Sequence, residues 1–219
     1  MKRKKQPWPT KDIMTQIYDK HLWGGTEFDF YSGYGSHDNT IVNTYLEAVT
    51  HFLASFRDPL IICDLGCGDF NIGKQLIPLS KKYIAIDIVA PLIERNKKRF
   101  HADNLEFHSL DIAKDELPIG DCAILRQVLQ HVSNAEIQKI LDKLVSYKYV
   151  ILTEHIPMGN FTPNKDIISG QGIRLKQNSG VDLLRPPFNL KIKDAKNLTT
   201  YYVESPTKSQ ITTTMYQLS

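Results

Sequence analysis

Three acidic residues, Asp64, Asp87 and Asp111, each follow an apolar run that is typical of a β-strand. The carboxyl ends of parallel strands meet at one edge of a sheet, so we expect the three carboxylates to share a crevice. Asp87 lies nineteen residues after Gly68, a spacing at which a carboxylate accepts hydrogen bonds from ribose hydroxyls. The pattern therefore predicts a site for a ribose-containing ligand.

A glycine turn, Gly66-Cys67-Gly68, directly follows the first of these runs, at residues 60–65. An uninterrupted apolar run of this length predicts a strand that is buried on both faces of a parallel sheet. Because glycine has no Cβ and a freer backbone than other residues, a ligand can approach the main chain closely. A dinucleotide-binding turn would need a third glycine at position 71, where the sequence has Asn71.

Strand and helix signals alternate after this turn, which predicts an α/β fold of parallel strands joined by right-handed crossovers. Asn71 is expected to cap a helix that runs through residue 76. Further helices are expected at residues 91–100 and 134–145. After the first strand, the expected strands lie at residues 83–87, 105–110, 122–125, 149–153, 198–203 and 211–216.

The first 59 residues form a separate N-terminal part in this interpretation, and residues 60–219 form the core. Apolar residues at helical spacing predict helices at residues 11–22 and 41–56. Ser36 or Asp38 is expected to cap the second of these helices.

Two segments lack sustained periodicity. Residues 155–197 are rich in Gly, Asn and Pro, and residues 28–38 combine glycine with aromatic residues. A long irregular stretch in a compact domain is typical of a functional lid or a mobile insert. We therefore expect the N-terminal helices and residues 155–197 to cover the acceptor. Residues 155–180 and 28–38 are expected to become ordered when a ligand binds.

The composition suits a single domain, since 219 residues with 42% hydrophobic content can build a full core. No run approaches the roughly 18 apolar residues that a membrane span needs, so no membrane partner is expected. The net charge is +3, and the basic residues 1–5 are either a solvated terminus or a weak attraction for nucleic acid. The three cysteines fit a cytoplasmic location, and neither a disulfide framework nor a metal site is expected.

The string Asp-Leu-Gly-Cys-Gly-Asp-Phe at residues 64–70 resembles the first motif of the class I S-adenosylmethionine-dependent methyltransferases. The resemblance extends over residues 60–154, and the stretch Gln127-Val128-Leu129-Gln130-His131 is similar to the segment that follows the family's fourth strand. It implies a three-layer Rossmann-like fold with a seven-stranded, mostly parallel sheet whose last strand is antiparallel. It also implies S-adenosylmethionine as the cofactor, without a metal.

The resemblance assigns roles to individual residues. Asp64 and the two turn glycines match the residues that hold the methionine part of the cofactor. Asp87 matches the acid that binds both ribose hydroxyls, and Asp111 matches the acid at the adenine amino group, with Ile112 near the ring. The implied cofactor-binding residues are Asp64, Gly66, Cys67, Gly68, Asp87, Ile88, Asp111, Ile112, Arg126 and Gln127.

The sequence departs from the family pattern at two positions, where Phe70 replaces a third glycine and Arg126 replaces a small residue. An arginine at the inner end of the fourth strand requires an anion. A carboxylate of the cofactor or of an acidic acceptor would supply one, and so would a structural ion pair with Asp64 or Asp121.

Methyl transfer depends on in-line alignment and exclusion of water, because the sulfonium already activates the methyl group. If the acceptor also loses a proton, the candidate bases are His131, His155 and Glu154, all at or just past strand ends. A purely structural role is the alternative for both histidines. The acceptor is expected to be a small molecule, and the alternatives are an RNA or protein methyltransferase and a non-catalytic S-adenosylmethionine-binding protein.

Overall fold

The computed structural model describes residues 7–204 and 208–218, and its centre is one seven-stranded sheet in the spatial order β3-β2-β1-β4-β5-β7-β6. β1 to β5 run parallel, whereas β7 runs antiparallel to both β5 and β6. The predicted α/β fold with an antiparallel last strand is therefore confirmed. The strands are β1 (Leu60–Leu65), β2 (Ser80–Asp87), β3 (Leu105–Ser109), β4 (Cys122–Arg126), β5 (Tyr149–Pro157), β6 (Asp194–Val203) and β7 (Ser209–Gln217).

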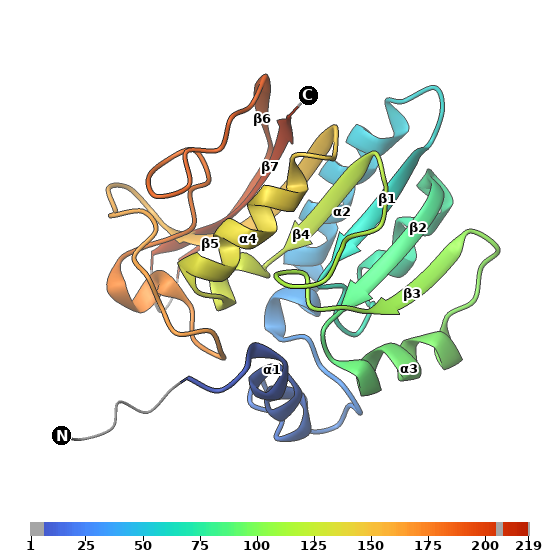
Figure 1. Ribbon diagram of the computed structural model, residues 1–219, viewed down its shortest axis with the longest axis horizontal. Coiled ribbons are helices and arrows are strands. Elements are labelled where there is room, and N and C mark those ends of the chain that lie inside the picture. The colour runs from blue at the N-terminus through green and yellow to red at the C-terminus, as the bar shows by residue number, and fades with distance from the viewer. Residues whose placement is uncertain (1–6, 205–207, 219) are drawn as a thin grey trace.

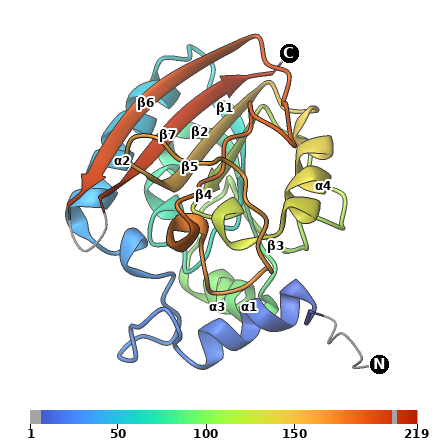
Figure 2. The same ribbon diagram turned by 90° about the vertical axis from the view of Figure 1, so that its left-hand side faces the viewer.

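Helices cover both faces of the sheet and one of its edges. α2 (Asn39–Ala54) lies behind the sheet in Figure 1 and α4 (Asn134–Leu144) lies in front of it, and Figure 2 shows them on opposite sides. α1 (Thr10–Asp19) and α3 (Ala90–Arg99) lie near the edge toward which the parallel strands point. This three-layer arrangement leaves the carboxyl ends of the strands facing α1.

Neighbouring residues of β4 enter different parts of the core, because side chains alternate between the faces of a strand. Ile124 belongs to the apolar cluster that contains Val49 of α2, and Leu125 belongs to the cluster that contains Leu141 of α4. Since both faces of β4 are buried, its sequence reads as one apolar run. Arg126 follows on the α2 side, where the chain leaves the strand.

α2 begins at Asp38, whose carboxylate accepts hydrogen bonds from the N–H groups of Thr40 and Ile41, both at 3.0 Å. This confirms Asp38 as the predicted cap, because an N-cap side chain satisfies N–H groups that lack a partner in the first turn. The alternative cap, Ser36, lies in the short 3-10 turn η1 (Tyr34–Ser36) instead.

The helix predicted from Asn71 through residue 76 is wrong. Two 3-10 turns, η2 (Gly73–Gln75) and η3 (Ile77–Leu79), connect β1 to β2 instead. Gly73 lies within this short segment and Pro78 follows it, and both residues disfavour an α-helix. The amide of Asn71 does not cap a helix and donates to the carbonyl oxygen of Ser36 at 2.8 Å.

Other boundaries also differ from the sequence-based expectation. Residues 110–121 connect β3 to β4 without a helix. Because β5 extends to Pro157 and β6 begins at Asp194, the irregular stretch is confined to residues 158–193. The basic residues 1–5 lie outside the described residues, as does the turn expected between the last two strands. None of the helices in the described ranges is long and apolar enough to cross a membrane.

Phe70→Ala should lower the free energy of unfolding by about 3–5 kcal/mol, because it leaves a cavity in the core. Phe70 is fully buried, and its ring packs against those of Tyr83, Phe100 and Phe107. Urea unfolding should be compared with the control Ile119→Ala, which trims a 93% exposed side chain and should change stability by less than about 0.5 kcal/mol. Equal effects of the two substitutions would contradict a packing role for Phe70.

Candidate cofactor and acceptor site

The turn after β1 holds both glycines in the left-handed region, with φ of 92° at Gly66 and 55° at Gly68. A Cβ on Gly66 would lie 2.4 Å from a methyl group of Val128, and a Cβ on Gly68 would lie 2.3 Å from Oγ of Ser32. The N–H of Gly66 donates to the carbonyl oxygen of Ile86 at 2.8 Å, which fastens the turn to β2. Both conformation and space therefore require glycine at these positions.

The three acids at strand ends, Asp64, Asp87 and Asp111, line one cavity, which confirms that they share a crevice. Asp64 and Asp87 are buried, whereas Asp111 is partly exposed. One carboxylate oxygen of Asp64 accepts a hydrogen bond from the hydroxyl of Tyr83 at 2.9 Å. The wall of the cavity is therefore acidic beside the glycine turn.

Burial shifts the protonation of the two inner carboxyls. Burial, together with the nearby charge of Asp87, raises the pKa of Asp64 to about 7, although the hydrogen bond from Tyr83 acts against the shift. Burial also raises the pKa of Asp87 to about 6, against the hydrogen bonds that Asp87 accepts from Val89 at 2.9 Å and Gly68 at 3.1 Å. Both groups thus change charge near neutral pH, because a buried carboxyl favours its uncharged form.

The cavity has a volume of about 430 Å³, and α1 and the loop that follows it contribute to its lining. Trp23 and Ser32 reach its wall from this segment. The structure brings every residue of the predicted cofactor set to the same cavity: Asp64, Gly66, Cys67, Gly68, Asp87, Ile88, Asp111, Ile112, Arg126 and Gln127.

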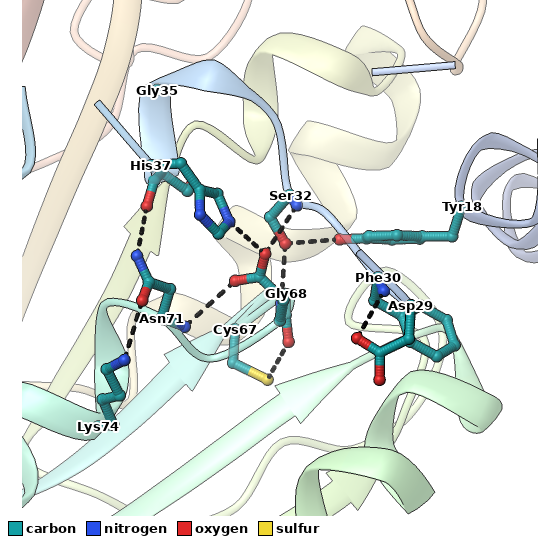
Figure 3. A network of polar contacts seen from close by, with 12 residues as sticks. Tyr18, Asp29, Phe30, Ser32, Gly35, His37, Cys67, Gly68, Asn71 and Lys74 are labelled. Atoms are coloured by element: carbon teal, nitrogen blue, oxygen red, sulfur yellow. Dashed lines mark hydrogen bonds and ion pairs between the residues drawn. The ribbon is translucent and has the colours of Figure 1, made fainter. Parts of the chain in front are cut away.

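Asp69 joins the glycine turn to the N-terminal cap, the name we give to residues 10–38. Its Oδ2 accepts a hydrogen bond from the N–H of Ser32 at 2.9 Å and lies 2.6 Å from Nε2 of His37. Figure 3 labels these two partners, Ser32 and His37, beside Gly68 of the glycine turn. The N–H of Asp69 donates to Oγ of Ser32 at 2.8 Å, and that oxygen lies 3.0 Å from the hydroxyl of Tyr18. Burial by itself would raise the pKa of Asp69, but the bonds from His37 and Ser32 lower it overall, so Asp69 keeps its charge.

A second set of contacts fastens the N-terminal cap to α3. Nε and Nη2 of Arg95 donate to the two carboxylate oxygens of Asp29 at 3.0 and 2.9 Å, and the side-chain bond from Arg95 lowers the pKa of Asp29. Nη1 of Arg95 donates to the carbonyl oxygen of Asp69 at 2.9 Å. The sequence analysis did not predict these contacts between the N-terminal cap and the core. In the sequence, only the position of Asp69, directly after Gly68, could have indicated them.

Arg126 extends from the end of β4 toward the N-terminal cap. Its Nη2 donates to the carbonyl oxygen of Gly35 at 2.5 Å, and its Nη1 donates to Oγ of Ser36 at 3.0 Å. Within the described ranges, no carboxylate lies within 4.0 Å of its guanidinium, so the structural ion pair with Asp64 or Asp121 that we considered is absent.

His131 lines the cavity but is held by the surrounding main chain. Its Nδ1 lies 3.2 Å from the carbonyl oxygen of Gly170, and its Nε2 lies 3.3 Å from Nε2 of Gln130. Nδ1 must therefore carry the proton that Gly170 accepts, which leaves Nε2 as an acceptor. Burial lowers the pKa of His131 to about 4, so the ring is neutral at pH 7 and a weak base.

The other two predicted bases occupy different environments. His155 lines the cavity, its Nε2 lies 2.8 Å from Oγ of Ser209, and burial lowers its pKa. Glu154 is buried on the opposite face of β5, outside the cavity wall, and accepts a hydrogen bond from the N–H of Leu129 at 3.0 Å. Burial raises the pKa of Glu154 to about 8, although Leu129 and the nearby Arg174 act against the shift.

Residues 62–147 match a protein family described as a methyltransferase domain. The 23S rRNA (uracil(1939)-C(5))-methyltransferase RlmD of Alcanivorax borkumensis is 27% identical over 114 residues, which cover 49% of this chain and 25% of that protein. Acetylserotonin O-methyltransferase of Bos taurus is 32% identical over 104 residues, which cover 45% of this chain and 30% of that protein. The chain thus matches between a quarter and a third of the length of these curated relatives.

The fold is similar to that of solved methyltransferases. The N-methyltransferase NodS from Bradyrhizobium japonicum WM9, in complex with S-adenosyl-L-homocysteine, has a TM-score of 0.64 at 11% identity, over 95% of this chain and 100% of that chain. Residues 62–147 thus match a methyltransferase domain, and the chain has a fold similar to that of the class I, S-adenosylmethionine-dependent methyltransferases. The predicted family resemblance is confirmed.

The pKa values of about 7 for Asp64 and about 6 for Asp87 predict weaker binding of S-adenosylhomocysteine as the pH falls from 8 to 5.5. A protonated carboxyl must lose its proton before it accepts ligand hydrogen bonds, and each such proton costs up to about tenfold in affinity per pH unit below the pKa. Isothermal titration at several pH values measures affinity against pH. Asp64→Asn should reduce the pH dependence of affinity near pH 7, where Asp64 changes its charge. A pH-independent affinity would contradict the role of these carboxylates.

The raised pKa of Asp64 should affect the stability of the ligand-free protein in the opposite direction: stability should increase as the pH falls, whereas ligand affinity decreases. The folded pKa of Asp64 exceeds the unfolded value of about 3.9, so its contribution is fully present below that value and lost as the pH rises through about 7. Wild type should therefore gain stability relative to Asp64→Asn when the pH falls from 8 to 6. Urea unfolding of both proteins measures this difference, in which the contributions of other groups cancel.

Asp69→Asn should loosen the N-terminal cap, because it keeps the size of the side chain but removes the charge that faces His37. Hydrogen bonds to a charged group are worth roughly 1.5–3 kcal/mol, so amide exchange in residues 28–38 should accelerate by about tenfold or more. The exchange of α4 should stay unchanged, as should the whole profile of the exposed control Asp103→Asn. Unaltered exchange in the cap would show that Asp69 does not hold it.

Proposed function

We propose that this chain is an S-adenosylmethionine-dependent methyltransferase that methylates a small-molecule acceptor. The observation that carries the proposal is that the glycine turn and the three strand-end acids line one cavity. Gly66 and Gly68 themselves line this cavity, so a ligand could lie against the main chain there. When bound, S-adenosylmethionine supplies a methyl group that its sulfonium already activates.

The cavity wall contains suitable groups for each part of this cofactor. The carboxylate of Asp87 would accept both ribose hydroxyls, because each oxygen can accept more than one hydrogen bond. Asp111 would accept a hydrogen bond from the adenine amino group, with Ile88 and Ile112 beside the ring. Asp64, next to the glycine turn, would face the positively charged methionine end.

A small acceptor is favoured by the N-terminal cap, which lies over the strand ends and contributes Tyr18, Trp23 and Ser32 to the cavity wall. Beyond the cofactor residues, the wall includes Trp23, His155, Val203 and Ile211, a largely apolar surface. Such a surface excludes water from the methyl group, which methyl transfer requires. Methylation of RNA or protein, and cofactor binding without catalysis, are the alternatives that the experiment below distinguishes.

If the acceptor loses a proton, we favour His155 as the base. It faces the cavity, whereas Glu154 lies outside the cavity wall. His131 has a pKa of about 4, and Gln130 and Gly170 already engage both of its ring nitrogens. His155 is thus the predicted base whose position best allows it to hold a proton from a bound molecule.

The proposal keeps the division into an N-terminal part at residues 1–59 and a core at residues 60–219. It also keeps the cytoplasmic location, which the unpaired Cys63, Cys67 and Cys122 fit. Within the described ranges, no group of three or more His, Cys, Asp or Glu side chains could hold a metal ion. The expected absence of a metal remains a prediction.

Asp87→Asn should weaken binding of S-adenosylmethionine by at least about tenfold in isothermal titration, since charge-assisted hydrogen bonds to the ribose are lost. Transfer of label from methyl-tritiated S-adenosylmethionine to a cell extract should fall in parallel, while Asp103→Asn, at an exposed position, should behave as wild type. After size separation, the label should appear in the low-mass fraction.

Label in RNA or protein would contradict the small-molecule acceptor. Binding without any transfer would favour the non-catalytic alternative. Failure of the wild type to bind S-adenosylmethionine would contradict the proposed cofactor.

A further inference from the structure

The guanidinium of Arg126 lies against the cavity without a carboxylate partner among the described residues. Gly35 and Ser36 of the N-terminal cap accept hydrogen bonds from Nη2 and Nη1, and the ring of Tyr45 lies 4.9 Å from the guanidinium carbon. Neutral partners orient an arginine but do not balance its charge. The environment is therefore that of a cation held in place for an anion.

Two polar atoms at this point have no hydrogen-bond partner among the residues that the structure describes: Nε of Arg126 and the hydroxyl of Tyr45. Both residues line the cavity, and Tyr45 is only 3% exposed. Burial raises the pKa of Tyr45, so its hydroxyl keeps its proton and remains available as a donor. Buried donors without an acceptor cost free energy and are rare in native proteins, so a ligand with acceptor oxygens would remove this cost.

The nearest acidic groups do not supply the missing acceptor. Asp69 is engaged by His37 and Ser32, and Asp64 accepts a hydrogen bond from Tyr83. The pKa of Asp64, raised to about 7 by burial, also leaves that group partly uncharged at neutral pH. The positive charge of Arg126 is therefore incompletely balanced by the protein.

We propose that Arg126 and Tyr45 form a subsite for an oxyanion, a carboxylate or phosphate group of a molecule bound in the cavity. The inference rests on the proposed function, because it names the chemistry that this methyltransferase site recognises. The guanidinium supplies charge and fixed donors, and the tyrosine hydroxyl supplies one further donor. The oxyanion belongs either to the methionine end of the cofactor or to the methyl acceptor.

Tyr45→Phe and Arg126→Lys test the subsite. Tyr45→Phe removes only a hydroxyl that has no partner, so the melting temperature of the ligand-free protein should stay the same or rise. Arg126→Lys keeps the charge but loses the planar pair of donors. The matched control is Tyr147→Phe, because the hydroxyl of Tyr147 donates to the carbonyl oxygen of Pro118 outside the cavity wall.

Two ligands locate the source of the oxyanion. S-adenosylhomocysteine carries the amino-acid carboxylate, whereas methylthioadenosine lacks the whole amino-acid end. If the cofactor supplies the oxyanion, both variants should bind S-adenosylhomocysteine at least about tenfold more weakly and methylthioadenosine as well as wild type does. The control should bind both ligands normally.

If the acceptor supplies the oxyanion, the two variants should bind both ligands normally. Millimolar phosphate or acetate should then raise the melting temperature of wild type saturated with S-adenosylhomocysteine, but not that of either variant. Equal weakening of both ligands would overturn the subsite, and so would anion effects that the two variants share with wild type. The lack of any change in either assay would overturn it too.

A different result would contradict the proposed function and not the subsite: wild type would bind neither S-adenosylhomocysteine nor methylthioadenosine. An anion-dependent rise in the melting temperature of the ligand-free wild type, lost in both variants, would still support the subsite in that case.

Discussion

The attachment of the N-terminal cap to the glycine turn depends on one buried carboxylate, that of Asp69. It follows the glycine turn directly and binds the N-terminal cap through Ser32 and His37. A buried charge without such partners would be strongly unfavourable, so the turn and the cap stabilise each other. The glycine turn, which lines the cavity, thereby also holds the N-terminal cap in place.

This coupling gives the cavity a polarised wall. Asp64, Asp87 and Asp111 lie at the strand ends on one side, and Arg126 lies under the cap on the other. Because the inner carboxyls are buried, they exchange protons near neutral pH and respond to the charge of whatever binds. A ligand with a cationic centre and an anionic group would match both sides, and the cofactor that we propose has both.

Much of the fold and of the cofactor wall could be predicted because both follow from strand chemistry. Apolar runs mark the buried strands, and parallel pairing then brings the acids at their ends together. The contacts of the N-terminal cap, residues 10–38, with the glycine turn could not be predicted in this way. Ser32 and Asp69 lie far apart in sequence, and no periodicity links them. The helix expected after Asn71 failed for a local reason, since Gly73 and Pro78 disfavour an α-helix in this short segment.

A crystal structure of the protein with S-adenosylhomocysteine would test the central claim most directly, because it shows where each part of the ligand lies. Our account predicts the ribose hydroxyls on the carboxylate of Asp87, the adenine amino group at Asp111, and the sulfur beside Gly66 and Gly68. A ligand bound outside this cavity, or one whose ribose makes no contact with Asp87, would contradict it.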